Sequence, residues 1–403
     1  MGFIVQFVQE RLIMAHKIIL LLLRTACGLC FFSNMTGATQ AIDAAKLEDG
    51  FIAGCLRQDS DCFYQNVQWR DADGYDVRET YLRRLRDPHA VEQARRWLSE
   101  APFCPTARTL EQETVRFELA TLVADRWRSV PALVQEPGGC LAPAALGLRP
   151  GDTLRLRVDT RITARGDSFA AYAVRLPPSY PDRALIVLAP GASKAPVYFD
   201  LREEDGRRSG GVLRQTHVLL REPSFPAAAI PMLAASTLPS WRALARLHRQ
   251  HEDSQLDAEP KLPVFPGLSK RDVVERALRW LHARVRYSHN RFRDGAVFPE
   301  QSVSAMLGGG MADCKGIALL FRAVMKKNGI DVQTVAVSSA GRRPVSWRVP
   351  GAWADHVISY VPDLDLYLDA GVPLDIQNKL QGQERFRYEM GLNLATGEFG
   401  VIR

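Results

Sequence analysis

The chain has 403 residues, of which 46% are hydrophobic and 24% charged, with a formal net charge of +7 at pH 7. This length exceeds one ordinary hydrophobic core, so we expect two folded domains and a targeting segment. The composition is that of a globular protein and excludes a disordered or collagen-like chain. The basic residues are scattered and do not form a stripe with aromatic residues, so nucleic acid is not a predicted partner.

Residues 1–41 are typical of a bacterial-type secretory signal peptide. An apolar run, Ile18–Leu23, follows a basic residue and leads to small residues that extend to Ala41. Arg24 interrupts the apolar segment, which argues against a membrane-spanning helix, and no later run is long enough to span. We therefore expect export to the periplasm or the medium, with no transmembrane anchor after signal removal.

Seven cysteines are present, and the signal peptide contains two of them, so the cysteines left to explain are Cys55, Cys62, Cys104, Cys140 and Cys314. Four early cysteines in an exported chain favour disulfides. Any of three connectivities is compatible with the sequence, and Cys55–Cys62 with Cys104–Cys140 is the simplest. Four reduced, buried cysteines are the alternative. Cys314 stands apart and requires a separate explanation.

Hydrophobic periodicity divides the next part of the chain into two segments. In 42–108, apolar residues at helical spacing predict a small helical segment, with helices at Asp76–Asp87 and Val91–Glu100. In 109–250, period-two alternation and turns rich in Gly, Pro and Asp predict an antiparallel β-sandwich. Its candidate strands are Val115–Leu119, Leu154–Val158, Ser168–Leu176, Ala184–Leu188, Pro196–Leu201 and Gly211–Arg221.

A second domain is expected after a polar linker. Ser240 is a good cap for an amphipathic helix, and the linker is placed at 251–266. The second domain then covers 267–380, where Ser269 caps the first helix, and a C-terminal tail covers 381–403. Together these segments predict an α+β fold.

The segment around Cys314 carries the strongest signal for chemistry. A glycine-rich loop leads to Asp313, a good N-cap, and then to an apolar helix that ends at Gly329. Cys314 therefore lies in the first helical turn, where peptide dipoles and free N–H groups favour the nucleophilic thiolate. A small buried cysteine that only packs the helix is the alternative interpretation.

Two extended runs further along contain a histidine and a carboxylate. A hairpin centred between Pro362 and Asp363 would place His356 opposite Asp369 on one face, and a four-residue loop suits Pro362 better than a two-residue turn. A carboxylate in this position can orient the imidazole beside a thiolate, as acyl-transfer chemistry requires. Taken alone, His356 is an ordinary strand residue and Asp369 an ordinary turn residue.

Short motifs follow one another over residues 268–375: Val285-Arg286-Tyr287, Phe298-Pro299, Asp313-Cys314-Lys315, Asn328-Gly329-Ile330, Asp355-His356-Val357-Ile358 and Tyr367-Leu368-Asp369. In this order they resemble the transglutaminase-like family, α+β relatives of papain-type enzymes. The resemblance implies that Cys314, His356 and Asp369 are a catalytic triad. The chain has Ala312 and Gly316 where members of the family commonly have Gly and Asp. The preceding β-rich region resembles a domain of unknown function that often stands before such domains in bacteria.

These features predict an exported cysteine acyltransferase or amide hydrolase that acts on a protein or peptide amide through a thioester acyl-enzyme. The alternative is a weakly active or inactive envelope-binding or scaffold module of the same fold, motivated by Ala312 and Gly316, and a disulfide-stabilised structural protein is a third possibility. No metal and no cofactor are predicted. His282 and His289 lack a metal-ligand spacing, and Gly310–Gly316 lacks the Gly-Lys-Ser/Thr ending of a phosphate-binding loop.

Overall fold

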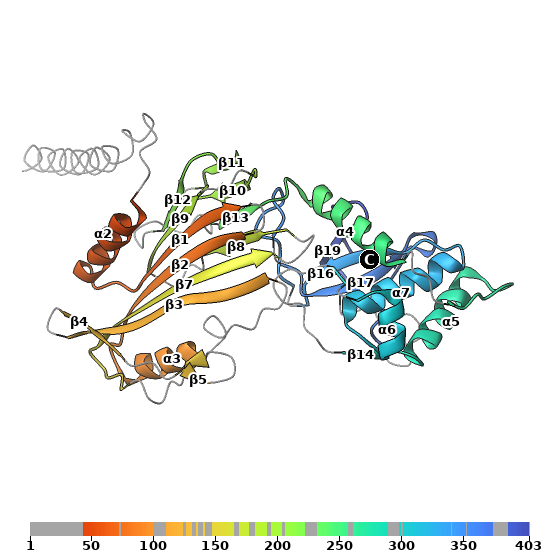
Figure 1. Cartoon of the computed structure of the whole chain (residues 1–403), viewed down its shortest axis with the longest axis horizontal. Coiled ribbons are helices and arrows are strands. Elements are labelled where there is room, and N and C mark those ends of the chain that lie inside the picture. Colours follow the sequence, from red (N-terminus) through yellow and green to blue (C-terminus); the bar gives the residue numbers. More distant parts are fainter. Residues whose placement is uncertain are drawn as a thin grey trace, which may run out of the picture. The chain divides into compact units, whose positions relative to one another are not determined.

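Figure 1 shows a computed structural model of the chain, which describes residues 43–71, 74–99, 110–123, 126–130, 134–135, 140–141, 147–164, 169–176, 182–191, 195–203, 206–221, 232–256, 261–288, 298–299, 301–339, 341–351, 353–373 and 386–402. Residues Ala44–Arg403 form one compact unit, to which the contacts below belong. The predicted signal peptide, Cys104 and His289 lie outside the described residues. No helix within these ranges is long and apolar enough to cross a membrane.

A seven-stranded sheet has the strand order β12-β9-β1-β2-β7-β3-β4. Its strands are β1 (Cys62–Asp71), β2 (Gly74–Arg84), β3 (Leu110–Val123), β4 (Arg126–Ser129), β7 (Thr153–Ala164), β9 (Arg183–Ala189) and β12 (His217–Arg221). All neighbours are antiparallel except β1 and β9, which run parallel with Tyr64 opposite Leu185. Strand β1 lies in the segment 42–108 that was predicted to be helical, so that prediction is wrong for these residues. Its parallel pairing with β9 also differs from the antiparallel pairing predicted for 109–250, because residue alternation within a strand does not specify its partner or direction.

Strand β2 occupies most of the segment predicted as a helix at Asp76–Asp87. Val77 belongs to a hydrophobic core on one face of the sheet, whereas Leu82 belongs to the cluster that packs against helix α2 (Ala44–Arg57). A strand covered on both faces lacks a fully polar side, and so lacks clean period-two alternation. The helix prediction failed for this reason, although the second predicted helix is present as α3 (Pro88–Ser99).

A second sheet shares a hydrophobic core with the first. Its order is β11-β10-β13-β8, with every neighbouring pair antiparallel, and its strands are β8 (Ala171–Arg175), β10 (Tyr198–Arg202), β11 (Arg208–Val212) and β13 (Met232–Ser236). The shared core contains Trp69 from the first sheet and Phe199 and Leu233 from the second. The Tyr75 hydroxyl also donates a hydrogen bond to the carbonyl oxygen of Ala171 (2.9 Å). Apolar burial between the sheets is therefore supplemented by a specific polar contact.

A disulfide between Cys55 and Cys62 joins the end of α2 to the start of β1, and this predicted pair is confirmed. Cys140 lies in the short strand β6 (Cys140–Leu141), which pairs with β5 (Val134–Gln135). Because Cys104 is outside the described residues, its pairing with Cys140 stays a prediction.

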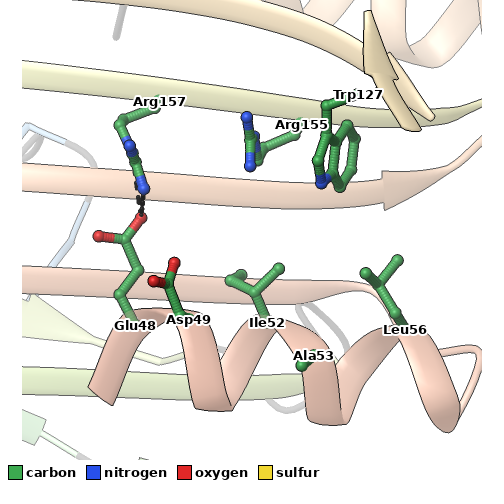
Figure 2. A pocket seen from close by; sticks show the side chains of 8 residues that line it. All are labelled: Glu48, Asp49, Ile52, Ala53, Leu56, Trp127, Arg155 and Arg157. Atoms are coloured by element: carbon green, nitrogen blue, oxygen red, sulfur yellow. Dashed lines mark hydrogen bonds and ion pairs between the residues drawn. The ribbon is translucent and has the colours of Figure 1, made fainter. Parts of the chain in front are cut away.

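Helix α2 is also held to the first sheet by a buried ion pair, which Figure 2 shows. Glu48 is only 1% exposed and accepts hydrogen bonds from Thr80 Oγ1 (2.7 Å) and Arg157 Nη2 (2.5 Å). Beside this pair, a cavity of about 150 Å³ lies between the helix and the sheet. The guanidinium of Arg155 lines it and lies 4.4 Å from the ring centre of Trp127. The charge pair fixes where α2 sits on the sheet, because breaking a buried pair is costly.

Helix α4 (Trp241–Leu256) begins directly after its predicted cap, Ser240. It continues to Leu256, so the predicted linker at 251–266 is wrong in its first part. The polar residue Glu252 is buried and accepts a hydrogen bond from Arg322 Nη1 (2.8 Å). Polarity in this segment therefore reflects a buried ion pair and not a solvated linker.

The C-terminal part of the chain combines a five-stranded sheet, in the order β18-β17-β16-β19-β20, with helices α5 to α7. Helix α7 packs against β16 and β17, and α5 and α6 contact α7 (Figure 1). The elements are α5 (Lys270–His282), β14 (Arg286–Tyr287), α6 (Val303–Gly309), β15 (Met311–Ala312), α7 (Cys314–Lys327), β16 (Gln333–Val337), β17 (His356–Val361), the 3₁₀ turn η3 (Pro362–Leu364), β18 (Leu366–Leu368), β19 (Met390–Asn393) and β20 (Glu398–Val401). The predicted cap of α5, Ser269, accepts a hydrogen bond from Asp272 N.

Strands β19 and β20 lie in the segment predicted as a C-terminal tail, 381–403, so that prediction is wrong for these residues. Leu392 of β19 is fully buried. Both strands are short and contain a glycine, so they lack the β-branched pattern by which strands are recognised. Close packing explains Gly391, because a side-chain carbon there would lie 2.8 Å from Val335 Cγ1.

We expect Glu48→Ala to lower the free energy of unfolding by about 3 kcal/mol, because Arg157 would keep its charge in a largely buried site without its main acceptor. Asp49→Ala, the exposed neighbour on the same helix, is the matched control and should change stability by less than about 0.5 kcal/mol. Urea denaturation followed by circular dichroism measures both values. Equal stabilities of the two variants would show that the ion pair does not hold α2.

Candidate active site

The first turn of α7 presents Cys314. Asp313 caps the helix by accepting a hydrogen bond from Gly316 N (2.9 Å), and its other oxygen pairs with Lys315 Nζ (2.6 Å). After the last turn, Gly329 has a φ angle of 71°, as a helix-ending glycine does. The predicted cap and helix end are present. The helix is buried on nearly all sides, because Ala318, Leu319 and Ala323 are buried as well as Ile317, Leu320, Phe321, Val324 and Met325.

His356 is the first residue of β17 and is paired with Val337 of β16. The preceding residue, Asp355, is anchored by Ser339, whose backbone N–H (2.6 Å) and hydroxyl (2.9 Å) both donate to its carboxylate. The imidazole stacks on Phe386, with ring centres 5.4 Å apart. These contacts restrict the position and tilt of the imidazole ring.

Asp369 holds the imidazole from the other side. His356 Nε2 lies 2.7 Å from Asp369 Oδ2. Asp369 is 5% exposed, and its second oxygen accepts a hydrogen bond from Gly371 N (3.0 Å). The carboxylate is therefore fixed by the backbone that follows it, and little water competes for its bond to the histidine.

The hairpin between these two residues differs in register from the prediction. Ser359 pairs with Leu368, two residues beyond the predicted partner, and the loop between β17 and β18 spans Pro362–Asp365. The predicted loop length is right, but its centre is one residue off. Because side chains alternate between faces with a period of two, a shift of two residues leaves the histidine and the carboxylate on the same side.

Cys314 is 3% exposed and is hydrogen-bonded through its side chain to His356. Since Nε2 of the ring faces Asp369, Nδ1 is the nitrogen that remains for the sulfur. Burial acts to lower the pKa of His356, but the hydrogen bonds to Asp369 and Cys314 and the charges of both groups outweigh it and raise that pKa to about 10. At neutral pH the ring is therefore protonated, which is the state that stabilises a neighbouring thiolate.

Two residues next to these groups were not predicted as parts of the site. His282, which has no metal-ligand spacing in the sequence, has Nε2 2.7 Å from the carbonyl oxygen of Ala370, the residue after Asp369. Tyr287 lies within hydrogen-bonding reach of Cys314. Burial, together with the charges of Cys314 and Asp369, raises the pKa of Tyr287. The Val-Arg-Tyr tripeptide was visible in the sequence as part of the family resemblance, but no spacing rule linked it to the cysteine.

Ala312 and Gly316, two departures from the family pattern, pack against one another. A side-chain carbon at Gly316 would lie 3.1 Å from Ala312 Cβ and 2.5 Å from Met306 Sδ. The space that a larger residue at position 316 would need is thus filled by the Ala312 methyl group and by Met306. The two departures are complementary, and neither alters the thiol, the imidazole or the carboxylate.

Metal binding would need a separate set of ligands. Within the part of the chain that the structure describes, no group of three or more His, Cys, Asp or Glu side chains converges as ligands of one metal ion. The acidic residue of the candidate site, Asp369, already accepts hydrogen bonds from His356 and Gly371. The arrangement offers a thiol, an imidazole and a carboxylate for chemistry.

No protein-family model matches the chain, and no curated protein matches it significantly. Among solved structures, the chain resembles a candidate protease from Parabacteroides distasonis at 16% identity and a TM-score of 0.49, covering 85% of this chain and 71% of the other. A candidate cysteine protease from Cytophaga hutchinsonii matches at 10% identity and a TM-score of 0.21, covering 78% of this chain and 81% of the other. Because both TM-scores are below 0.5, we infer the chemistry of the site from its own geometry.

We expect Gly316→Ala to destabilise the protein by about 1–3 kcal/mol, because the added methyl group overpacks the start of α7. In an open helical position the same change is stabilising by up to about 1 kcal/mol, and Gly50→Ala in α2, where a side-chain carbon meets nothing within 4 Å, is the matched control. Adding Ala312→Gly to Gly316→Ala should recover part of the loss. Thermal or urea unfolding measures all three; stabilisation by Gly316→Ala would contradict the complementary packing.

Proposed function

We propose that the chain is an exported cysteine enzyme that transfers or hydrolyses the acyl group of a protein or peptide amide. Cys314 is the nucleophile, His356 moves protons, and Asp369 orients the imidazole. The observation that supports this proposal is the continuous hydrogen-bonded series from the thiol through the imidazole to the carboxylate. A sulfur nucleophile, a base and a third group that orients the base are the elements of nucleophilic acyl transfer.

The geometry supports a two-stage reaction. The Cys314 thiolate attacks the amide carbon, and the carbonyl π electrons move to oxygen to form a tetrahedral oxyanion. The C–N bond then breaks, the amine leaves with the proton donated by His356, and a thioester remains. In the second stage His356 takes a proton from water or from an amine, whose oxygen or nitrogen bonds to the thioester carbon. The C–S bond then breaks, which returns the Cys314 thiolate and releases a carboxylic acid or a new amide. Asp369 holds the ring so that Nδ1 faces the sulfur.

The disulfide between Cys55 and Cys62 supports an exported location. Disulfides persist in the periplasm and outside the cell, whereas reducing systems keep cytosolic thiols reduced. The predicted signal peptide at 1–41 leads to the same proposal. In that location the substrate class is a protein or peptide amide, with water or an amine as the acceptor.

A binding or scaffold module of the same fold is the second proposal. The low exposure of Cys314, 3%, favours it, because an acyl donor must reach the sulfur to react. The two proposals differ in one property. A nucleophilic thiol reacts quickly with small electrophiles at neutral pH, whereas a thiol that only packs a helix does not.

The decisive experiment measures the reaction of Cys314 with iodoacetamide and with p-nitrophenyl acetate at pH 7, with the modified residue assigned by mass spectrometry. An ordinary thiol is only about 3% ionised at this pH, so an activated one can react up to roughly 30-fold faster with iodoacetamide. We expect fast alkylation, a burst of p-nitrophenol and an acetylated Cys314. His356→Ala should lower both rates by at least about 10-fold because the positive partner of the thiolate is lost.

His89→Ala, which removes an exposed histidine of α3, is the matched control and should react like the native protein. If the native thiol reacts no faster than free cysteine and His356→Ala changes nothing, the enzyme proposal is wrong and the binding module is favoured. Fast alkylation without any acetylated Cys314 would contradict the acyl-transfer step alone.

The pH dependence of acylation provides a second test. Because the pKa of His356 is raised to about 10, the imidazolium persists through pH 8 to 9, and the rate should fall only as the pH approaches 10. Asp369→Asn removes the negative charge that raises this pKa and leaves a neutral amide beside the ring, so the imidazolium is lost at lower pH and the alkaline limb should move toward neutral pH. Rates of acylation by p-nitrophenyl acetate, corrected for its spontaneous hydrolysis, measure the alkaline limb of the native protein and of the variant. An unmoved limb would show that Asp369 does not set the charge of the ring.

A further inference from the structure

The proposed acyl transfer needs hydrogen-bond donors for the tetrahedral oxyanion. The first hydrogen bond along α7 runs from Ile317 N to the carbonyl oxygen of Asp313 (2.9 Å), and the Asp313 carboxylate accepts the backbone N–H of Gly316. The backbone N–H of Cys314, the first helical residue, has no acceptor within the helix. The backbone N–H of Cys314 is therefore one available donor. Effective stabilisation of an oxyanion commonly uses a second donor on the opposite side, which the groups described so far do not provide.

The backbone places Tyr287 beside the start of α7. Strand β14 runs parallel to β15, with Tyr287 opposite Ala312. The backbone N–H of Ser288 donates to the carbonyl oxygen of Ala312 (2.8 Å), and that of Arg286 donates to the carbonyl oxygen of Gly310 (2.9 Å). These bonds tie Tyr287 to the residues that lead directly into Cys314.

The ring of Tyr287 also lies against the backbone that follows Asp369. A side-chain carbon at Gly371 would lie 3.2 Å from both Cδ2 and Cε2 of Tyr287 and 3.2 Å from Asp369 Oδ1. The ring packs against the hydrophobic cluster that contains Cys314, and its hydroxyl is hydrogen-bonded to the cysteine side chain. Tyr287 is therefore held between the nucleophile and the carboxylate by contacts on both sides.

We propose that Tyr287 is a further catalytic residue, whose hydroxyl is the second donor to the oxyanion formed on Cys314. This inference rests on the proposed function. In the free enzyme the hydroxyl donates to the Cys314 sulfur. When the sulfur forms its bond to carbon, negative charge moves from sulfur to the carbonyl oxygen, and the hydroxyl donates to that oxygen instead. Breakage of the bond to the leaving group restores the carbonyl, and no proton leaves the tyrosine.

The environment of Tyr287 is consistent with a donor that stays protonated. Burial and the charges of Cys314 and Asp369 raise the pKa of its hydroxyl, so it keeps its proton over the working range of the thiol–imidazole pair. A neutral donor beside two acidic groups gives hydrogen-bond stabilisation without competing with His356 for the proton.

Tyr287→Phe keeps the ring and removes only the donor. Acylation of Cys314 by p-nitrophenyl acetate forms an oxyanion, whereas alkylation by iodoacetamide is a direct displacement that forms none. We expect Tyr287→Phe to slow acylation by about 10²-fold, the effect of losing one oxyanion donor, and to change alkylation by less than about 3-fold. Tyr360→Phe, which removes the hydroxyl bonded to Asp365 in the same domain, is the matched control and should change neither rate.

The ratio of the two rates separates the possible failures. If Tyr287→Phe acylates at the native rate, Tyr287 is not an oxyanion donor, although the enzyme proposal stands. If acylation and alkylation fall in the same proportion, the tyrosine acts on the thiolate alone and the inference is wrong. If the native protein does not acylate at all, the proposed function itself has failed.

A second variant tests whether another hydrogen-bond donor at position 287 restores acylation. Tyr287→His retains a planar ring with a hydrogen-bond donor, and we expect it to acylate faster than Tyr287→Phe at equal alkylation rates. Circular dichroism and the melting temperature verify that each variant is folded. Equal acylation by the two variants would contradict a donor role.

Discussion

The hydrogen bond between His356 and Asp369 is the contact on which the geometry of the candidate site depends. It joins the first residue of β17 to the residue after β18, and the four-residue loop between these strands makes it possible. The residues around Asp369 are held in turn by Gly371 N and by His282, which contacts the carbonyl of Ala370. The thiol comes from a separate element, the start of α7, which packs against β17. The site is thus assembled from backbone segments that secondary structure already fixes, so few flexible side chains need to be ordered for it to form.

The position of Cys314 could be predicted because it depends on local sequence signals. Features that depend on contacts between distant parts of the sequence could not be predicted. Asp313 and Gly329 define α7 because capping and helix termination depend on a few neighbouring residues. That His356 and Asp369 lie on the same face of the hairpin could be predicted. Side chains alternate between the two faces of a strand, so a register error of two residues does not change the face on which they lie. Tyr287 was missed because its place beside Cys314 depends on the pairing of β14 with β15, which no periodicity in the sequence reveals. Strand β2 and the end of α4 were misread because burial on both faces and the buried ion pair of Glu252 hide the usual contrast between apolar and polar sides.

The packing around Ala312 and Gly316 gives these two departures from the family pattern a different interpretation. In the sequence they suggest a degraded site, since the family commonly has Gly and Asp at these positions. In the structure, the methyl group of Ala312 and the sulfur of Met306 occupy the space beside Gly316. The start of α7 therefore accommodates both residues, and the buried Lys315 is paired with Asp313, whose side chain is partly exposed. An Asp at position 316 would need a different arrangement of Met306. The side chains at positions 306, 312 and 316 therefore share one volume, and a larger side chain at one position requires a smaller or rearranged one at another.

The position of the disulfide has a consequence for how the chain matures. Cys55 and Cys62 are separated by only seven positions and lie near the amino terminus, whereas Cys314 lies far along the chain. If export proceeds amino terminus first, the two early thiols enter the oxidising compartment together and can combine before Cys314 has crossed. The two thiols are close to each other in the unfolded chain, because closing the short loop between them costs little entropy. The order of emergence would therefore keep the Cys314 sulfur out of a disulfide with Cys55 or Cys62.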